Sequence, residues 1–257
     1  MSTKHTFTIL CLLAAVAVSK LFLASCQPTP PEPTATLAII PTPVLWHVQH
    51  TSSLRWMTPL MNQCTQEQQD NTALITSEIS APHLDPNEAD FLLYWGEPDK
   101  PAGYAATVGW DELAVIVHPA NTISHLELDG LRAIYSGSVL SWRELDELSP
   151  IKGDIKVWSY AENEDVQQNL EALLALRTIT PRAYLAPDPE AMLEAISRDP
   201  AAIGFLPLRS IDASVRTVEA VDASVQALSF PIILISPTEP QGAQREWALC
   251  LQDNLSD

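Results

Sequence analysis

Short apolar runs alternate with amphipathic stretches along most of the chain. The apolar runs, rich in Val, Ile, Leu and aromatic residues, predict buried strands at 44–49, 73–79, 91–95, 104–108, 113–117, 155–160, 202–206, 215–221 and 232–235. Apolar residues at helical spacing predict helices at 54–64, 126–135, 165–176, 189–196 and 241–251. Gly109-Trp110-Asp111 predicts a turn between two of the strands. This alternation predicts an α/β fold with largely parallel sheets.

Residues 1–25 have the pattern of an export signal. Lys4 and His5 precede an apolar run over 7–18, and Leu23-Ala24-Ser25-Cys26 follows it. Leu-Ala-Ser-Cys resembles the bacterial lipobox, in which the Cys is lipidated and becomes the first mature residue. This resemblance implies an acylated, palmitate-bearing Cys26 that anchors the protein to the cell membrane. The alternative is an uncleaved membrane anchor, but Lys20 would weaken a spanning helix more than a signal peptide.

Residues 26–43 are rich in Pro and Thr. Clustered Pro residues block helices and central strands and favour extended polyproline geometry. We expect this segment to be a stiff spacer that holds a folded domain clear of the bilayer.

The charge balance excludes some partners. The chain carries 32 acidic and 14 basic side chains, a formal net charge of −18, and 46% of its residues are hydrophobic. The apolar fraction is ample for a packed core, which rules out wholesale disorder. Removal of residues 1–25 takes away two Lys and no acid, so the mature charge becomes −20. Such a surface disfavours nucleic acid and anionic membrane surfaces, and any bound anion must be held by local dipoles.

The cysteines fit an oxidising compartment. Cys11 lies in the signal and Cys26 in the lipobox, which leaves Cys64 and Cys250. Two thiols outside the cytoplasm are a natural disulfide pair, and the alternative is two buried free thiols.

A family resemblance appears in the middle of the chain. Leu113-Ala-Val-Ile-Val-His-Pro-Ala-Asn121 runs into Leu126-Glu-Leu-Asp-Gly-Leu-Arg-Ala-Ile-Tyr-Ser-Gly137, and Trp142 follows. Later the chain reads Ala202-Ile-Gly-Phe-Leu-Pro207. These segments resemble the phosphate-binding-protein family of ABC transporters in order and spacing, from residue 44 to about 235.

The resemblance implies a type 2 periplasmic-binding-protein fold, with two α/β lobes and a ligand cleft between them. Residues 44–118 and 206–257 would form lobe one, and 119–205 lobe two. The protein would be an extracytoplasmic, lipid-anchored and monomeric solute-binding protein that delivers a small polar ligand to an ABC permease. The alternative is a surface sensor or scaffold on the same fold without a transport role.

The first ligand motif of the family corresponds to Thr51-Ser52-Ser53 at the start of a predicted helix. Free amides and the positive helix end favour an anion or a polar oxygen there. Simple N-capping by one hydroxyl explains the same residues. Arg55 either adds charge to the cleft or is solvated.

The second ligand motif of the family, Arg followed by Gly-Ser-Gly-Thr, is missing. The corresponding stretch runs from Trp158 to Asp165 and carries three acids, Glu162, Glu164 and Asp165. A phosphate dianion would meet like charge here, so the sequence predicts another ligand, with Tyr160, Glu162 and Asn163 as contacts. The alternative is that the acids only favour a helix N-terminus.

Tyr94 and Trp95 end an apolar strand on the expected cleft side. Their rings either stack on a ligand or pack beneath the closed cleft. No nucleophile or phosphate-loop motif is recognised, and His47 and His50 point to opposite faces of a strand. We therefore expect no enzymatic activity, no metal site and no cofactor.

Overall fold

The computed structural model describes residues 42–68, 71–98, 103–221 and 228–256. The predicted export signal, the predicted lipidation site Cys26 and the predicted spacer up to residue 41 lie outside the described residues.

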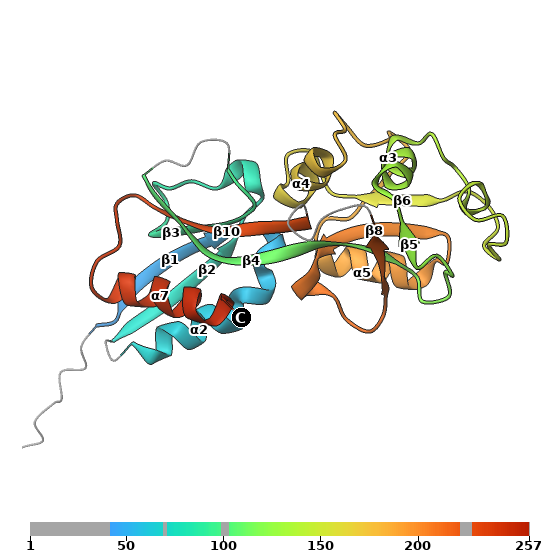
Figure 1. The fold of residues 1–257 in the computed structure, drawn as a ribbon. Helices are drawn as coiled ribbons and strands as arrows, with labels where there is room; N and C mark the ends of the chain where they lie inside the picture. Colours follow the sequence, from blue (N-terminus) through green and yellow to red (C-terminus); the bar gives the residue numbers. More distant parts are fainter. Residues whose placement is uncertain (1–41, 69–70, 99–102, 222–227, 257) are drawn as a thin grey trace, which may run out of the picture. The chain divides into compact units, whose positions relative to one another are not determined.

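Strands and helices follow one another along the described chain (Figure 1). The strands are β1 (Val44–His50), β2 (Thr72–Glu78), β3 (Phe91–Trp95), β4 (Tyr104–Val117), β5 (His125–Leu126), β6 (Lys156–Ser159), β7 (Tyr184–Leu185), β8 (Ala202–Pro207), β9 (Arg216–Ala220) and β10 (Ser229–Ser236). The α-helices are α2 (Thr58–Glu67), α3 (Leu128–Ser136), α4 (Asp165–Leu173), α5 (Pro189–Arg198) and α7 (Ala243–Leu255). The short 3-10 helices are η1 (Ser52–Met57), η2 (Ala81–His83), η3 (Trp142–Glu144) and η4 (Leu208–Ser210).

The strands join in the order β2-β1-β3-β10-β4-β8-β6-β7, and β9 pairs with β4 and β5. The long strand β4 belongs to two groups. Residues 104–112 of β4 pair with β10, and together with β1, β2 and β3 they make the first strand group. Residues 113–117 of β4 pair with β8 and β9, and together with β5, β6 and β7 they make the second strand group.

The sheet is mixed, which corrects the prediction of largely parallel sheets. The pairs β1–β2, β1–β3, β6–β8, β6–β7 and β5–β9 are parallel. The pairs made by β10 and β4 are antiparallel. The reason is that β10, from near the chain end, inserts between β3 and β4 and runs against both.

Strand β4 is continuous, whereas the sequence predicts a turn at Gly109-Trp110-Asp111. These three residues keep extended pairing with Pro231 and its neighbours in β10, with one register irregularity close by. The carboxylate of Asp111 also accepts the amides of Glu112 and Arg209. Cross-strand bonding therefore overrides the local turn propensity, and one strand serves both groups.

The helix predicted at 54–64 is two elements, η1 and α2. Pro59 lies in the first turn of α2 and has no amide hydrogen, so the preceding turn cannot continue the same hydrogen-bond ladder. The helix predicted at 126–135 is α3, which spans Leu128–Ser136, and its C-cap Gly137 has a left-handed conformation with φ 77°.

Aromatic residues fill the core of each strand group. In the first group, Phe91 lies 4.8 Å from Trp247 of α7 between ring centroids, and Trp46 packs edge-on against both. Figure 1 shows α2 and α7 side by side at this sheet. In the second group, Tyr135 and Tyr160 both pack edge-on against Phe205. The buried rings fix the strand ends from which the candidate site is built.

Candidate ligand-binding site

The site begins where β1 ends. Strand β1 runs parallel to both neighbours, so its carboxyl end lies at the sheet edge where α/β folds bind ligands. Thr51 and Ser53 are fully buried there, whereas Ser52 is half-buried. Thr51 makes no side-chain cap to η1. Its hydroxyl lies 2.7 Å from that of Ser53 instead, so these hydroxyls are committed to something other than capping.

The hydrogen-bond partner of these hydroxyls is Asp165, the first residue of α4. The Ser53 hydroxyl donates to Asp165 Oδ2 at 2.7 Å, and the Trp95 amide donates to the same oxygen at 3.2 Å. The Val166 amide donates to the other carboxylate oxygen at 2.8 Å. The Thr51 and Ser53 hydroxyls lie 2.7 Å apart, and both of them stabilise the carboxylate of Asp165 by hydrogen bonding. Asp165 is thus held as a bound anion at a helix N-terminus.

Burial shapes the acidity of this carboxyl. Asp165 is 2% exposed, and burial raises its pKa to about 6, although the hydrogen bonds from neighbouring hydroxyls and amides offset part of the shift. At neutral pH the group is therefore ionised and contributes one negative charge to the site.

The rest of α4 is bonded to the end of β3. The Tyr94 hydroxyl donates to Gln168 Oε1 at 3.0 Å, and Asn169 Nδ2 donates to the Trp95 carbonyl at 3.0 Å. Gly96 permits this approach, because a Cβ there would lie 2.3 Å from the Asn169 amide nitrogen. Its φ of +96° also suits glycine. Helix α4, which follows β6 of the second strand group, is therefore in direct polar contact with β3 of the first strand group.

Arg55 is committed to carboxylates from both strand groups. Its guanidinium bonds both oxygens of Glu78 at 2.6 Å, contacts Asp188 Oδ2 at 3.3 Å and pairs with Glu190. Glu78 ends β2, whereas Asp188 caps α5 and Glu190 lies in its first turn. The hydrogen bond with Glu78 is the main cause that raises the pKa of Arg55 above its ordinary value. The positive charge is thus shared among internal partners.

The other residues that the sequence places in the second motif differ in burial and in hydrogen bonding. Tyr160 is buried, its hydroxyl has no hydrogen-bond partner among the described residues, and burial raises its pKa well above the ordinary value. Glu162 and Asn163 are exposed in the turn before α4, outside the Asp165 network. Glu164, the N-cap of α4, accepts the Ala81 amide at 3.1 Å.

The network includes residues that sequence reasoning missed. Gln168, Asn169, Asp188 and Glu190 face the other strand group, but along the chain they look like ordinary polar helix positions. The sequence does contain a feature that points to Asp165, because acids replace the expected Gly-Ser-Gly-Thr at this position. Trp95, expected to stack or pack, is fully buried against Phe230, and within the part of the chain that the structure describes its indole nitrogen has no hydrogen-bond partner.

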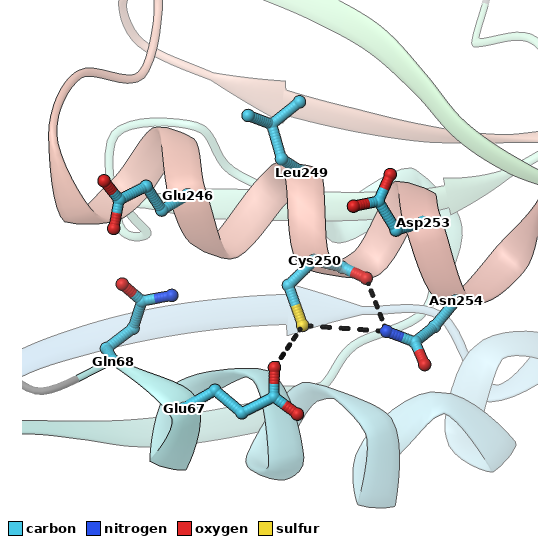
Figure 2. A pocket seen from close by; sticks show the side chains of 7 residues that line it. All are labelled: Glu67, Gln68, Glu246, Leu249, Cys250, Asp253 and Asn254. Atoms are coloured by element: carbon cyan, nitrogen blue, oxygen red, sulfur yellow. Dashed lines mark hydrogen bonds between the residues drawn. The ribbon is translucent and has the colours of Figure 1, made fainter.

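Cys64 of α2 and Cys250 of α7 form a disulfide. Figure 2 shows the pocket beside Cys250, about 540 Å³, lined by Glu67, Gln68, Glu246, Leu249, Cys250, Asp253 and Asn254. Glu67 Oε2 lies 3.4 Å from Cys250 Sγ, and this is a nonbonded contact because a disulfide sulfur carries no proton. The Asn254 amide donates to the Cys250 carbonyl at 2.9 Å. The disulfide therefore borders a pocket whose lining includes the acids Glu67, Glu246 and Asp253.

Within the part of the chain that the structure describes, no group of three or more His, Cys, Asp or Glu side chains could hold a metal ion. Among the same residues, no helix combines the length and the apolar character needed to cross a membrane.

No family model matches the sequence, and no curated protein matches it either. Solved structures do match. The phosphate transport receptor of ABC type from Vibrio cholerae aligns over 81% of this chain and 93% of its own, with 19% identity and a TM-score of 0.63. A phosphate ABC transporter substrate-binding protein with bound phosphate from Clostridium perfringens aligns over 80% and 92%, with 14% identity and a TM-score of 0.69.

The fold occurs outside transport as well. The regulatory domain of OxyR2 from Vibrio vulnificus, in its reduced form, aligns over 82% of this chain and 95% of its own, with 13% identity and a TM-score of 0.56. At such low sequence identities, these structural alignments establish a shared fold and nothing more. The chain thus has the α/β fold of type 2 periplasmic binding proteins, as the sequence predicts, and its structural neighbours include phosphate-binding receptors.

Proposed function

We propose that this protein is a lipid-anchored, extracytoplasmic solute-binding protein of an ABC importer, and that its solute is not phosphate. The similarity to two ABC phosphate receptors supports a solute-binding role on this fold. Cys26 would hold the protein at the membrane, the spacer would extend it from the surface, and a permease would receive the solute from a monomeric protein.

The two strand groups would be the two lobes. The sequence places the second lobe at 119–205. The pairing of β9 with β4 and β5 favours a second lobe that extends through Ala220, with the return to lobe one between β9 and β10.

One observation carries the exclusion of phosphate: the carboxylate of Asp165 accepts the Ser53 hydroxyl and the Trp95 amide. These are donors of the kind that would bind an oxyanion at this sheet edge. A phosphate beside Asp165 would find them occupied. It would also meet a like charge, at a cost of about 1–4 kcal/mol for unit charges near 4 Å.

Thermal unfolding in the presence of candidate solutes tests the proposal. We expect a neutral or cationic polar solute to raise the Tm, because a ligand that binds only the folded state stabilises it. Phosphate is expected to leave the Tm unchanged. A rise with phosphate equal to the best solute would contradict the proposed ligand class.

A surface sensor or scaffold is the second candidate, and a specific observation favours it. Bonds between Arg55, Asp165 and their partners already join the two strand groups through the chain's own side chains. A Tm unmoved by neutral, cationic and anionic solutes at millimolar concentration would favour this role over transport.

A further inference from the structure

Direct hydrogen bonds and ion pairs between the chain's own groups connect helices α4 and α5 to the first strand group. Each joins a residue of the first strand group, or of its connections, to a residue of these helices or their N-caps. The pairs are Ser53–Asp165, Trp95–Asp165, Tyr94–Gln168, Trp95–Asn169, Ala81–Glu164, Arg55–Asp188 and Arg55–Glu190.

Asp165 is the most constrained member of this set. Its carboxylate is ionised at neutral pH and almost fully buried, and its hydrogen bonds to Ser53 and the Trp95 amide are charge-assisted. A buried charge is tolerated only when it is paired or hydrogen-bonded, so loss of these donors without access of water would be strongly unfavourable. The hydrogen bonds between this carboxylate and its donors therefore form or break together.

Arg55 supplies the complementary charge at a second point. Its guanidinium reaches Glu78 in the first strand group and both Asp188 and Glu190 at the start of α5. An anion from the second group and a cation from the first thus each bind across the boundary between the groups.

We propose that Asp165 is an internal ligand that holds the two strand groups together in the absence of any solute. Its carboxylate accepts hydrogen bonds from donors that could otherwise bind an oxyanion, with Arg55 as a second tie. This inference concerns the resting conformation and does not depend on which solute, if any, the protein binds.

Backbone amides that donate across the boundary report on this contact. The Ala81 amide bonds to Glu164, and the Trp95 amide bonds to Asp165. The Gly96 amide donates to Pro231 within the first strand group, so it is the internal control. Hydrogen exchange at these amides is measured by NMR on the full chain, refolded from denaturant with the disulfide intact to remove any solute.

The wild-type chain is expected to protect Ala81 and Trp95. The variant Ser53→Ala removes one hydroxyl and touches neither Ala81 nor Glu164. We expect it to accelerate exchange at Ala81 about tenfold, the effect of losing one ordinary hydrogen bond, while Gly96 is unchanged. Asp165→Ala is expected to act in the same direction, and added formate is expected to restore part of the protection by replacing the missing carboxylate.

The matched control is Asp199→Ala, which removes an acid paired with Lys156 inside the second strand group and leaves Ala81 protected. The inference is overturned if the Ala81 amide is unprotected in the solute-free wild type. It is also overturned if both Ser53→Ala and Asp165→Ala leave Ala81 as protected as in the wild type.

Discussion

The hydroxyl of Ser53 donates a 2.7 Å hydrogen bond to the carboxylate of Asp165, which lies 112 positions later in the chain. Ser53 follows the carboxyl end of β1 and Asp165 begins α4, so the bond links two strand groups that share only the strand β4. The proposed exclusion of phosphate and the proposed tie between the two groups both rest on this hydrogen bond.

Asp165 predicts a specific dependence of stability on pH. Its pKa is about 6 in the folded protein and about 3.9 in an unfolded chain, so the folded state binds the proton more tightly. The resulting stability is fully present below about pH 4 and is lost as the pH rises to about 6, a change of about 3 kcal/mol. Asp165→Asn cannot ionise, so denaturant unfolding should show a flatter decline across this window.

Burial raises the pKa of Asp111 to about 6 in the same way, which makes Asp111→Asn the matched variant. Each substitution should remove its own share of the decline. Identical pH profiles for the wild type and Asp165→Asn would contradict this description of the buried carboxyl.

Gly96 predicts a second effect. Gly96→Ala would need both a left-handed backbone and displacement of Asn169, whose amide lies 2.3 Å from the added Cβ position. Left-handed strain and the lost Asn169 hydrogen bond together should lower the free energy of unfolding by about 2–4 kcal/mol. Gly153→Ala is the control, because Gly153 has φ +89° and no atom within 4 Å of its Cβ position. A loss no larger in Gly96→Ala than in the control would show that α4 does not need this close approach.

The disulfide predicts a third effect. Cys64 and Cys250 are separated by 186 positions, so the bond constrains most of the unfolded chain. Replacement of both by Ser should lower the free energy of unfolding by about 2–5 kcal/mol. Chemical denaturation measures the loss, and the reduced wild type should unfold at the same denaturant concentration as the double variant. Unfolding of the reduced protein at the midpoint of the oxidised protein would contradict a stabilising role.

The proposed lipid anchor at Cys26 predicts a fourth outcome. Cys26→Ser removes the thiol that would be acylated, so the protein should move from the membrane fraction to the soluble fraction after cell disruption. Mass spectrometry of the wild-type amino terminus should find acyl chains on Cys26. A Cys26→Ser protein that stays in the membrane fraction would instead favour the uncleaved anchor.

Much of the fold follows from local pattern. Phe91–Trp95 is buried at every position and was predicted with its bounds, and α4 begins at Asp165 as predicted. The continuity of β4 through Gly109 was not predicted, because it depends on pairing with β10, more than a hundred residues away. Local propensity carries no information about that pairing.

The site was less accessible to sequence reasoning for a related reason. The replacement of Gly-Ser-Gly-Thr by acids was visible, and it pointed to position 165 as well as to Glu162. Only the fold shows that Asp165 faces Ser53 whereas Glu162 faces solvent. Arg55 was visible as a candidate for ligand charge, but its partners Asp188 and Glu190 lie on α5, far along the chain.

Calorimetric titration of phosphate into the solute-free protein shows whether Asp165 excludes phosphate from this site. Because Asp165 occupies the donors and supplies like charge, the wild type should give no binding heat at micromolar to millimolar phosphate. Asp199→Ala should behave as the wild type does. Saturable, micromolar binding of phosphate to the wild type would show that Asp165 does not exclude it.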